Sequence, residues 1–247
     1  MLWHAAVAAL LLRAVFPRIS FDRRRALVGW WSRKILRILG IATRVEGPVP
    51  AMDERGAMIA ANHVSWVDIF LISSVRPTRF IAKSEIRDWP IAGWIAEKSG
   101  TLFIRRGEWR SIAFISDKVH AALGEGDCVG LFPEGITSEG DRLLKFHSSL
   151  FEPAVANHAR VHPAAIRYER PDGELCREAS FAGDRSFMES LALLIRQRDV
   201  VARVMFAPAI ETRESTRRDV MKAAQARVAS LLGLPPAGTA PGTVAGR

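Results

Sequence analysis

Short apolar runs that alternate with helical patterns are the feature of this chain that most limits its possible folds. The run at 57–61, for example, leads directly into a helical pattern over 67–75. The alternation continues along the chain, with further strands expected near 79–82, 101–104, 128–132, 161–168 and 200–206, and further helices within 85–98, 109–123, 148–157 and 215–232. Strands that alternate with helices indicate an α/β sheet. We therefore predict an α/β fold in which helices flank a central mixed sheet.

The N-terminal segment combines apolar bulk with positive charge. Residues 1–12 are apolar except for His4, but this run is shorter than the roughly 20 apolar residues that a membrane-spanning helix needs. Residues 24–41 show a second helical pattern, whose apolar side chains gather within about 120° of the helix circumference. Such a helix can lie in the headgroup layer of a membrane, with Trp30 and Trp31 at its boundary. We predict an N-terminal membrane-docking helical pair; the alternative is a helix packed on the protein body.

The distribution of charge favours a membrane surface over a nucleic acid. The net charge is +9, and residues 1–50 hold nine Arg or Lys residues against two acids, which places +7 of it in this segment. Basic residues interleaved with apolar ones suit anionic lipid headgroups, whereas nucleic-acid binding requires a basic stripe on the globular body or a known motif. The two cysteines form no CxxC pair, and the histidines lack metal-ligand spacing. We therefore expect no nucleic-acid partner and no metal.

Turn and linker residues divide the chain into three parts. The sequence Gly-Pro-Val-Pro at 47–50 is a turn signal. The Pro- and Gly-rich end of the chain has the composition of a disordered segment. We predict membrane-association helices over 1–46, one globular domain over 47–234 and a disordered tail over 235–247.

The segment that follows the first strand, 62–68, contains a histidine and an aspartate. His63 and Asp68 are five residues apart, which on a regular helix would separate them by about 140°. They can meet only if His63 lies in the loop and Asp68 lies in the opening turn of the helix. In the simpler interpretation, Ser65 and Asp68 form a helix-start signal, and His63 is an ordinary loop residue.

Two later apolar runs also end in polar residues. One ends in Arg105 and Arg106, and arginines at a strand exit can bind a phosphate or a carboxylate with paired donors. The other ends at Pro133, which forces a bend, and Gly135 then permits a close approach of backbone to a ligand. Glu134 would project from the sheet edge, where sites in open α/β sheets lie. Each feature alone also fits an ordinary solvated strand exit.

Three motifs in this order make the chain resemble the glycerolipid acyltransferase family, typified by 1-acylglycerol-3-phosphate acyltransferase. The first family motif, Asn-His-x-x-x-x-Asp, is matched at 62–68, the second, Gly-x-x-Phe-Ile-x-Arg, at 100–106, and the third, Phe-Pro-Glu-Gly-x-x-Ser, at 132–138. An apolar stretch around Pro163 resembles a fourth motif. Each motif is loose alone, but three in order with compatible spacing are specific.

The resemblance implies a lysolipid O-acyltransferase that moves a fatty acyl group from a thioester to a free hydroxyl. His63 would be the general base, and Asp68 would fix its tautomer and stabilise the imidazolium. The acyl donor would be an acyl carrier protein thioester or an acyl-coenzyme A, with no other cofactor. The substrate-binding residues would be Asn62, Arg105, Arg106, Glu134, Gly135, Thr137 and Ser138.

Departures from the family pattern leave two acceptors open. Many members carry Glu-Gly-Thr-Arg-Ser, whereas this chain has Glu-Gly-Ile-Thr-Ser at 134–138, which weakens the case for a phosphate monoester such as 1-acylglycerol-3-phosphate. The residues Thr-Ser in this motif, and Ser-Ser-Leu-Phe at 148–151, resemble the corresponding sequences of members that acylate lyso-ornithine lipid. We expect membrane lipids as partners and a membrane-associated protein at the cytoplasmic face of the inner membrane. The alternative is a catalytically silent membrane-surface protein on the same fold.

Overall fold

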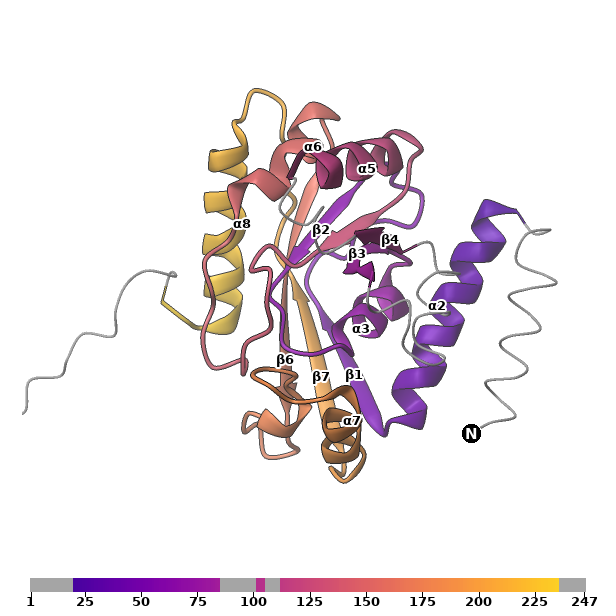
Figure 1. Cartoon of the computed structure of the whole chain (residues 1–247), viewed down its shortest axis with the longest axis vertical. Coiled ribbons are helices and arrows are strands. Elements are labelled where there is room, and N and C mark those ends of the chain that lie inside the picture. The colour runs from indigo at the N-terminus through magenta and orange to yellow at the C-terminus, as the bar shows by residue number, and fades with distance from the viewer. Residues whose placement is uncertain (1–19, 85–100, 105–111, 236–247) are drawn as a thin grey trace, which may run out of the picture.

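A central seven-stranded sheet organises the molecule (Figure 1). The computed structural model describes residues 20–84, 101–104 and 112–235. Within these residues the strand order is β1-β7-β6-β2-β5-β3-β4. The strands are Ile41–Glu46 (β1), Met58–Ala61 (β2), Arg79–Lys83 (β3), Leu102–Ile104 (β4), Val129–Leu131 (β5), Val161–Glu169 (β6) and Val200–Phe206 (β7). The strands β6 and β7 pair antiparallel and the other neighbours pair parallel, which confirms the predicted mixed sheet.

Helices cover both faces of the sheet, as predicted. The α-helices are Phe21–Ile38 (α2), Asp68–Val75 (α3), Ile112–Gly124 (α5), Glu152–Ala156 (α6), Phe187–Ile195 (α7) and Arg217–Leu232 (α8), and the short 3-10 helices are Ser148–Phe151 (η4) and Arg177–Ala179 (η5). Helices α5, α6 and α8 pack over one core, and α2, α3 and α7 pack over the other (Figure 1). The predicted helices at 85–98 and the tail from 236 onward lie outside the described residues.

The strand β2 shows how the sequence builds two cores at once. All of its residues are buried, as expected for a parallel strand that is covered on both faces. Successive side chains of a strand point to opposite faces, so Met58 and Ala60 join the core beneath α5 and α8, while Ile59 and Ala61 join the core beneath α2 and α3. Because β2 lies between β6 and β5, the loop that follows it emerges from the middle of one sheet edge.

Helix α2 packs on the body with one face. Leu36 is buried, and Nη1 of Arg33 donates to the carbonyl oxygen of Ser74 on α3 at 2.8 Å. On the outer side, Trp30 and Ile38 are 47% and 50% exposed. The structure therefore shows the packed helix that was the alternative for this segment, while membrane contact by its outer face stays a prediction. None of the described helices is both long enough and apolar enough to cross a bilayer.

Strand β1 is absent from the elements expected from the sequence. The expected helix reaches residue 41 and the expected globular domain starts at 47, but α2 ends at Ile38 and β1 is already an edge strand of the sheet. Only Ile41 of β1 is buried, so the strand lacks the apolar alternation by which strands are recognised. It is held by parallel pairing with β7, from Ile41 beside Val200 to Glu46 beside Met205, a contact that no local pattern encodes.

Candidate active site

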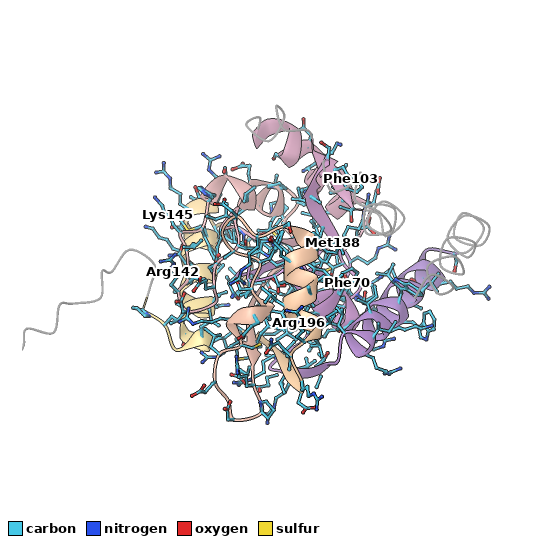
Figure 2. The ribbon with its side chains drawn as sticks, turned by 60° about the horizontal axis from the view of Figure 1, so that its bottom comes forward. Phe70, Phe103, Arg142, Lys145, Met188 and Arg196 are labelled. Atoms are coloured by element: carbon cyan, nitrogen blue, oxygen red, sulfur yellow. The ribbon has the colours of Figure 1, made fainter. Side chains whose placement is uncertain are left out.

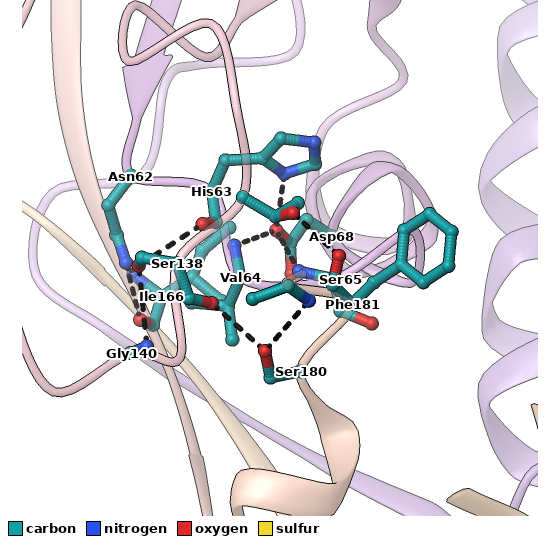
Figure 3. A network of polar contacts seen from close by, with 12 residues as sticks. Asn62, His63, Val64, Ser65, Asp68, Ser138, Gly140, Ile166, Ser180 and Phe181 are labelled. Atoms are coloured by element: carbon teal, nitrogen blue, oxygen red, sulfur yellow. Dashed lines mark hydrogen bonds and ion pairs between the residues drawn. The ribbon is translucent and has the colours of Figure 1, made fainter. Parts of the chain in front are cut away.

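The loop between β2 and α3 holds the histidine and the aspartate that were expected to meet (Figure 3). His63 lies in this loop, and Asp68 is the first residue of α3. The Nδ1 atom of His63 lies 2.8 Å from Oδ2 of Asp68. The predicted arrangement is therefore confirmed, because the loop position of one residue and the first-turn position of the other bring the two side chains together.

Asp68 is fully buried, and donors surround its carboxylate. Besides His63, its Oδ2 atom accepts the backbone N–H groups of Val64 at 2.8 Å and Ser65 at 2.9 Å. Its Oδ1 atom accepts the hydroxyl of Tyr168 at 2.7 Å. A carboxylate removed from water is stable as an anion only when hydrogen bonds or countercharges replace its hydration. The loop and Tyr168 of the strand β6 together supply such donors to the buried carboxylate of Asp68.

The simpler interpretation of this segment, a helix-start signal, is realised only in part. Asp68 does accept the N–H of Ser65, as the acid of a capping box would. The Ser65 hydroxyl, however, makes no hydrogen bond to the part of the chain that the structure describes. Val67, the residue before the helix, provides no side-chain cap. The carboxylate thus serves the loop and the histidine together.

The imidazole of His63 is fixed in one tautomer and one plane. An ionised carboxylate only accepts hydrogen bonds, so Nδ1 carries the proton and Nε2 keeps a free lone pair. The ring stacks on Phe132, with centroids 4.0 Å apart and planes 7° apart, and Phe132 stacks on Phe80. The side chain of His63 is 22% exposed, and Figure 3 shows its second nitrogen pointing away from Asp68. This nitrogen is available to take a proton.

Asn62 fastens the loop to the neighbouring strand β6. Its amide nitrogen donates to the carbonyl oxygen of Ile166 at 3.0 Å, and its amide oxygen accepts the Ile166 N–H at 2.7 Å. The side chain is buried. These contacts give Asn62 the role of holding the loop between β2 and α3 in place, and substrate contact by Asn62 stays a prediction.

Two residues of the third motif also hold the loop rather than face solvent. Ser138 donates its backbone N–H to the carbonyl oxygen of His63 at 2.8 Å. The hydroxyl of Thr137 donates to the carbonyl oxygen of Phe181 at 2.6 Å, and the hydroxyl of Ser180 donates to the carbonyl oxygen of Ser138 at 3.0 Å. The first and third motifs are therefore joined through the backbone, with the 180–181 segment clamped across them.

Glu134 is a buried acid that lies beside the pair formed by His63 and Asp68. It is 4% exposed, and neither carboxyl oxygen forms a hydrogen bond of normal geometry within the described part of the chain. Burial raises the pKa of Glu134 to about 8; the negative charge of Asp68 adds to the rise, while the nearby backbone of Leu144 and of His63 opposes it. Near pH 7 Glu134 therefore carries a proton, and its carboxyl group can donate a hydrogen bond.

The remaining predicted site residues fall into two groups. Gly135 has a φ of +76°, a conformation that glycine adopts freely and other residues rarely do, and the exposed imidazole of His147 lies beside it. Arg105 and Arg106 lie outside the described residues. In the described ranges, no three His, Cys, Asp or Glu side chains gather in a way that could hold a metal.

Helix α7, which is absent from the elements expected from the sequence, covers the first motif. Nε1 of Trp66 donates to Oγ of Ser190 on α7 at 3.1 Å. The helix begins with a capping box between Ser186 and Glu189, a signal that was present in the sequence. Figure 2 shows α7 at the surface, where Met188 is 67% exposed.

Tyr168 is a further residue of the site that no pattern in the sequence indicated. It lies 100 residues beyond Asp68 and belongs to none of the three motifs, although its strand carries the proline stretch that resembles the fourth. Only the position of β6 next to β2 brings it to the carboxylate. Together, the fold and the site define an α/β protein in which a buried aspartate holds a partly exposed histidine at a sheet edge, an arrangement suited to general-base catalysis.

Comparisons with known proteins agree with this class. A family model described as Acyltransferase matches residues 42–167. The chain is 36% identical over 205 residues to a lyso-ornithine lipid O-acyltransferase of Pseudomonas aeruginosa, covering 83% of this chain and 78% of that protein. It is 37% identical over 211 residues to a 1-acyl-sn-glycerol-3-phosphate acyltransferase of Neisseria meningitidis, covering 85% and 82%.

A solved structure shares the fold. The crystal structure of the 1-acyl-sn-glycerophosphate acyltransferase PlsC from Thermotoga maritima matches with a TM-score of 0.65 over 94% of this chain and 92% of that one, at 19% identity. The chain belongs to the acyltransferase family, and it is an acyltransferase enzyme.

Proposed function

We propose that this protein is a lysolipid O-acyltransferase in which His63 is the general base. The observation that carries the proposal is the buried Asp68, which holds Nδ1 of His63 at 2.8 Å and leaves Nε2 unpaired within the described residues. The names of the relatives from Pseudomonas aeruginosa and Neisseria meningitidis support lysolipids as the acceptor class.

The reaction follows from this geometry. Nε2 of His63 removes the proton from the acceptor hydroxyl while the hydroxyl oxygen attacks the carbonyl carbon of an acyl thioester. Asp68 stabilises the imidazolium that forms. When the tetrahedral intermediate collapses, the carbon–sulfur bond breaks and the departing thiolate takes the proton back from Nε2. The products are an ester and a free thiol, and His63 returns to its starting state.

Glu134 supplies a polar contact for the acceptor. Its carboxyl group is protonated near pH 7, because burial raises its pKa to about 8, so it offers a hydrogen-bond donor without a negative charge beside Asp68. A neutral acid here avoids the repulsion that a second carboxylate would exert on a phosphate or carboxylate head group. Arg105 and Arg106 supply positive charge toward the same head group.

For the acceptor head group, we place lyso-ornithine lipid ahead of 1-acylglycerol-3-phosphate. Thr137 stands where the family pattern has an arginine, and its hydroxyl is engaged with the carbonyl oxygen of Phe181. A phosphate monoester is bound best by charged, bidentate donors, and Thr137 offers none. The Neisseria meningitidis relative keeps 1-acylglycerol-3-phosphate as the second candidate.

The donor and the location complete the proposal. The acyl donor is a thioester of acyl carrier protein or of coenzyme A, and no other cofactor takes part. The enzyme is membrane-associated and works at the cytoplasmic face of the inner membrane. The exposed Trp30 and Ile38 of α2, with the basic residues around them, support contact with anionic lipid headgroups.

A parallel acylation assay tests this function. Membranes that contain the protein receive labelled acyl carrier protein thioester or acyl-coenzyme A, with lyso-ornithine lipid or 1-acylglycerol-3-phosphate as the acceptor. His63→Gln is compared with His162→Gln, because His162 is also paired with a carboxylate but lies at the other end of the sheet. We expect transfer to lyso-ornithine lipid that the first variant loses and the second keeps.

The other outcomes are equally informative. Transfer to 1-acylglycerol-3-phosphate alone would reverse the order of the two acceptors. No His63-dependent transfer to either acceptor, from a folded and membrane-bound protein, would reject the proposal in favour of a catalytically silent membrane-surface protein.

A further inference from the structure

Tyr168 is the only tyrosine of the chain, and its ring is completely buried. Its hydroxyl donates to Oδ1 of Asp68 at 2.7 Å, a hydrogen bond of full strength. The other oxygen of the same carboxylate receives His63, Val64 and Ser65. Within the described residues, Tyr168 is therefore the one partner of Oδ1.

Strand β6 holds the catalytic loop, which is the segment 62–67 between β2 and α3, at two points. The backbone of Ile166 pairs with the Asn62 amide, and two residues later Tyr168 reaches the carboxylate of Asp68. The first contact fixes the start of the loop through hydrogen bonds between the side-chain amide of Asn62 and the backbone of Ile166. The second contact reaches the group that binds the general base, so it can act on the chemistry as well as on the position of the loop.

We propose that Tyr168 is a positioning residue of the acyl-transfer site, which completes a Tyr168–Asp68–His63 hydrogen-bond chain and so sets how tightly His63 holds the proton that it removes. The proposal rests on the proposed function of His63 as general base. Tyr168 acts through Asp68 and does not itself touch the reacting atoms.

The phenol is suited to be a permanent donor. Burial raises the pKa of Tyr168 well above its ordinary value, and the charge of Asp68 raises it further. The hydroxyl therefore stays protonated at every pH at which the enzyme works. Its hydrogen bond always stabilises part of the negative charge of Asp68. A donor of this kind weakens the pull of the carboxylate on the imidazolium, so it opposes the binding of a proton at Nε2 of His63.

The sign of the effect follows. Without the hydroxyl, Oδ1 is a buried anionic oxygen with no partner among the described residues, and the carboxylate–imidazole pair binds a proton more tightly, whichever partner takes it. The acidic limb of the pH–rate profile then moves to higher pH. Glu134 also faces the pair, with its charge coupled to Asp68, but it is neutral below about pH 8 and so leaves the acidic limb unchanged.

The test compares Tyr168→Phe with a matched loss of another buried hydroxyl, Thr212→Val. Thr212 is 1% exposed and its hydroxyl donates to the carbonyl oxygen of Ala159 at 3.0 Å, remote from the catalytic loop. For Tyr168→Phe we expect an acidic limb displaced upward by about one pH unit, and therefore a kcat/KM that is lower by up to about tenfold on that limb. Thr212→Val loses similar stability with an unchanged pH profile. Thermal melts of both variants show that they fold.

The single tyrosine permits a second, graded test. Growth on fluorinated tyrosine replaces the phenol at one position only, with a more acidic and therefore stronger donor. The acidic limb should then move to lower pH, opposite to the displacement in Tyr168→Phe. A residue that served only packing would not give displacements of opposite sign with its ring retained in both proteins.

The readout does not depend on turnover alone. The ring signals of His63, assigned in NMR spectra with His63→Gln, report its titration directly, so a wild-type protein without lysolipid acylation would reject the proposed function and still test the Tyr168 proposal. Upward displacement in Tyr168→Phe and downward displacement with fluorotyrosine support the proposal. Titration and pH profiles that match those of wild type and Thr212→Val would overturn it.

Discussion

Two histidine–carboxylate pairs lie toward opposite ends of β2, and only one of them has the surroundings of an active site. His63 follows the C-terminal end of the strand and pairs with Asp68 at 2.8 Å. His162, on β6 beside the first half of β2, pairs with Glu54 at 3.0 Å. By distance alone the two pairs are almost equivalent.

They differ in what lies around each group. The ring of His63 is 22% exposed and offers Nε2 to the outside, whereas the ring of His162 is 7% exposed and its second nitrogen is buried without a partner in the described part of the chain. On the acid side, Asp68 is fully buried among four donors, whereas Glu54 is 17% exposed. A histidine that acts as a general base needs an acid that is held in place at one ring nitrogen and access to substrate at the other. Of these two histidines, only His63 has both.

The largest expected effect separates the two histidines directly. His63→Gln should lower kcat by about 10²–10⁴-fold, because the general base is lost, with little change in the free energy of unfolding. Steady-state rates and urea titrations of the same preparation check both statements. An equal loss of activity in His162→Gln would contradict the distinction between the pairs.

The second prediction concerns the acids. Asp68→Asn leaves one carbonyl oxygen to serve the donors that now share two oxygens, and its amide hydrogens would face N–H and O–H groups. We expect about 3 kcal/mol lower stability and at least about a hundredfold lower activity. Glu54→Gln is the matched control, for which we expect near-normal activity. Similar losses of activity in both variants would show that the anchoring of Asp68 has no special role.

The third prediction uses the raised pKa of Glu134. Burial raises this pKa from the ordinary value of 4.5 to about 8, so the folded state binds the proton more tightly than the unfolded state. Its contribution to stability is therefore complete below about pH 4.5 and is lost as the pH rises through 8, by an amount on the order of 5 kcal/mol.

The substitution Glu134→Gln checks this sign. The variant should lack the decline, so that the difference in unfolding free energy between variant and wild type grows in favour of the variant from pH 4.5 to pH 8. Urea titrations at several pH values measure this difference. A constant difference across the range would show that Glu134 ionises normally in the folded protein.

The smallest expected effect belongs to the second pair. His162→Gln and Glu54→Gln should each lower stability by about 1 kcal/mol, because one partly buried hydrogen bond is lost, and should leave kcat within about twofold of wild type. Thermal melts and the acylation assay measure both quantities. A large fall in kcat with intact stability in either variant would require a link from this end of β2 to the site.

Much of the fold could be predicted from local patterns, and the exceptions share a cause. The strands β2 to β7 and the helices α3, α5 and α8 follow apolar runs and helical periodicity that neighbouring residues set. Strand β1 is mostly exposed and is held by pairing with β7, so its residues lack the buried apolar run that marks the other strands. The capping box of helix α7 is present in the sequence, and this local signal is sufficient to predict where the helix begins.

The candidate site divides in the same way. The spacing of His63 and Asp68 could be interpreted because both partners come from one short loop and its helix. The three motifs also identified the family before any contact was known. The roles of Asn62 and Thr137, by contrast, depend on β6 and on the 180–181 segment, which the sequence does not place beside them.

The sequence by itself therefore determined most of the succession of strands and helices along the chain, the histidine–aspartate pair and the family. Tertiary structure alone decided which histidine is open to a substrate and how deeply Asp68 is buried. It also decided the raised pKa of Glu134 and the contact between Tyr168 and the carboxylate of Asp68. The physical reason is one of range. Spacing along the chain fixes contacts within a turn or a loop, but burial and the donors that compensate for it come from strands that the sheet order brings together, here β2, β5 and β6.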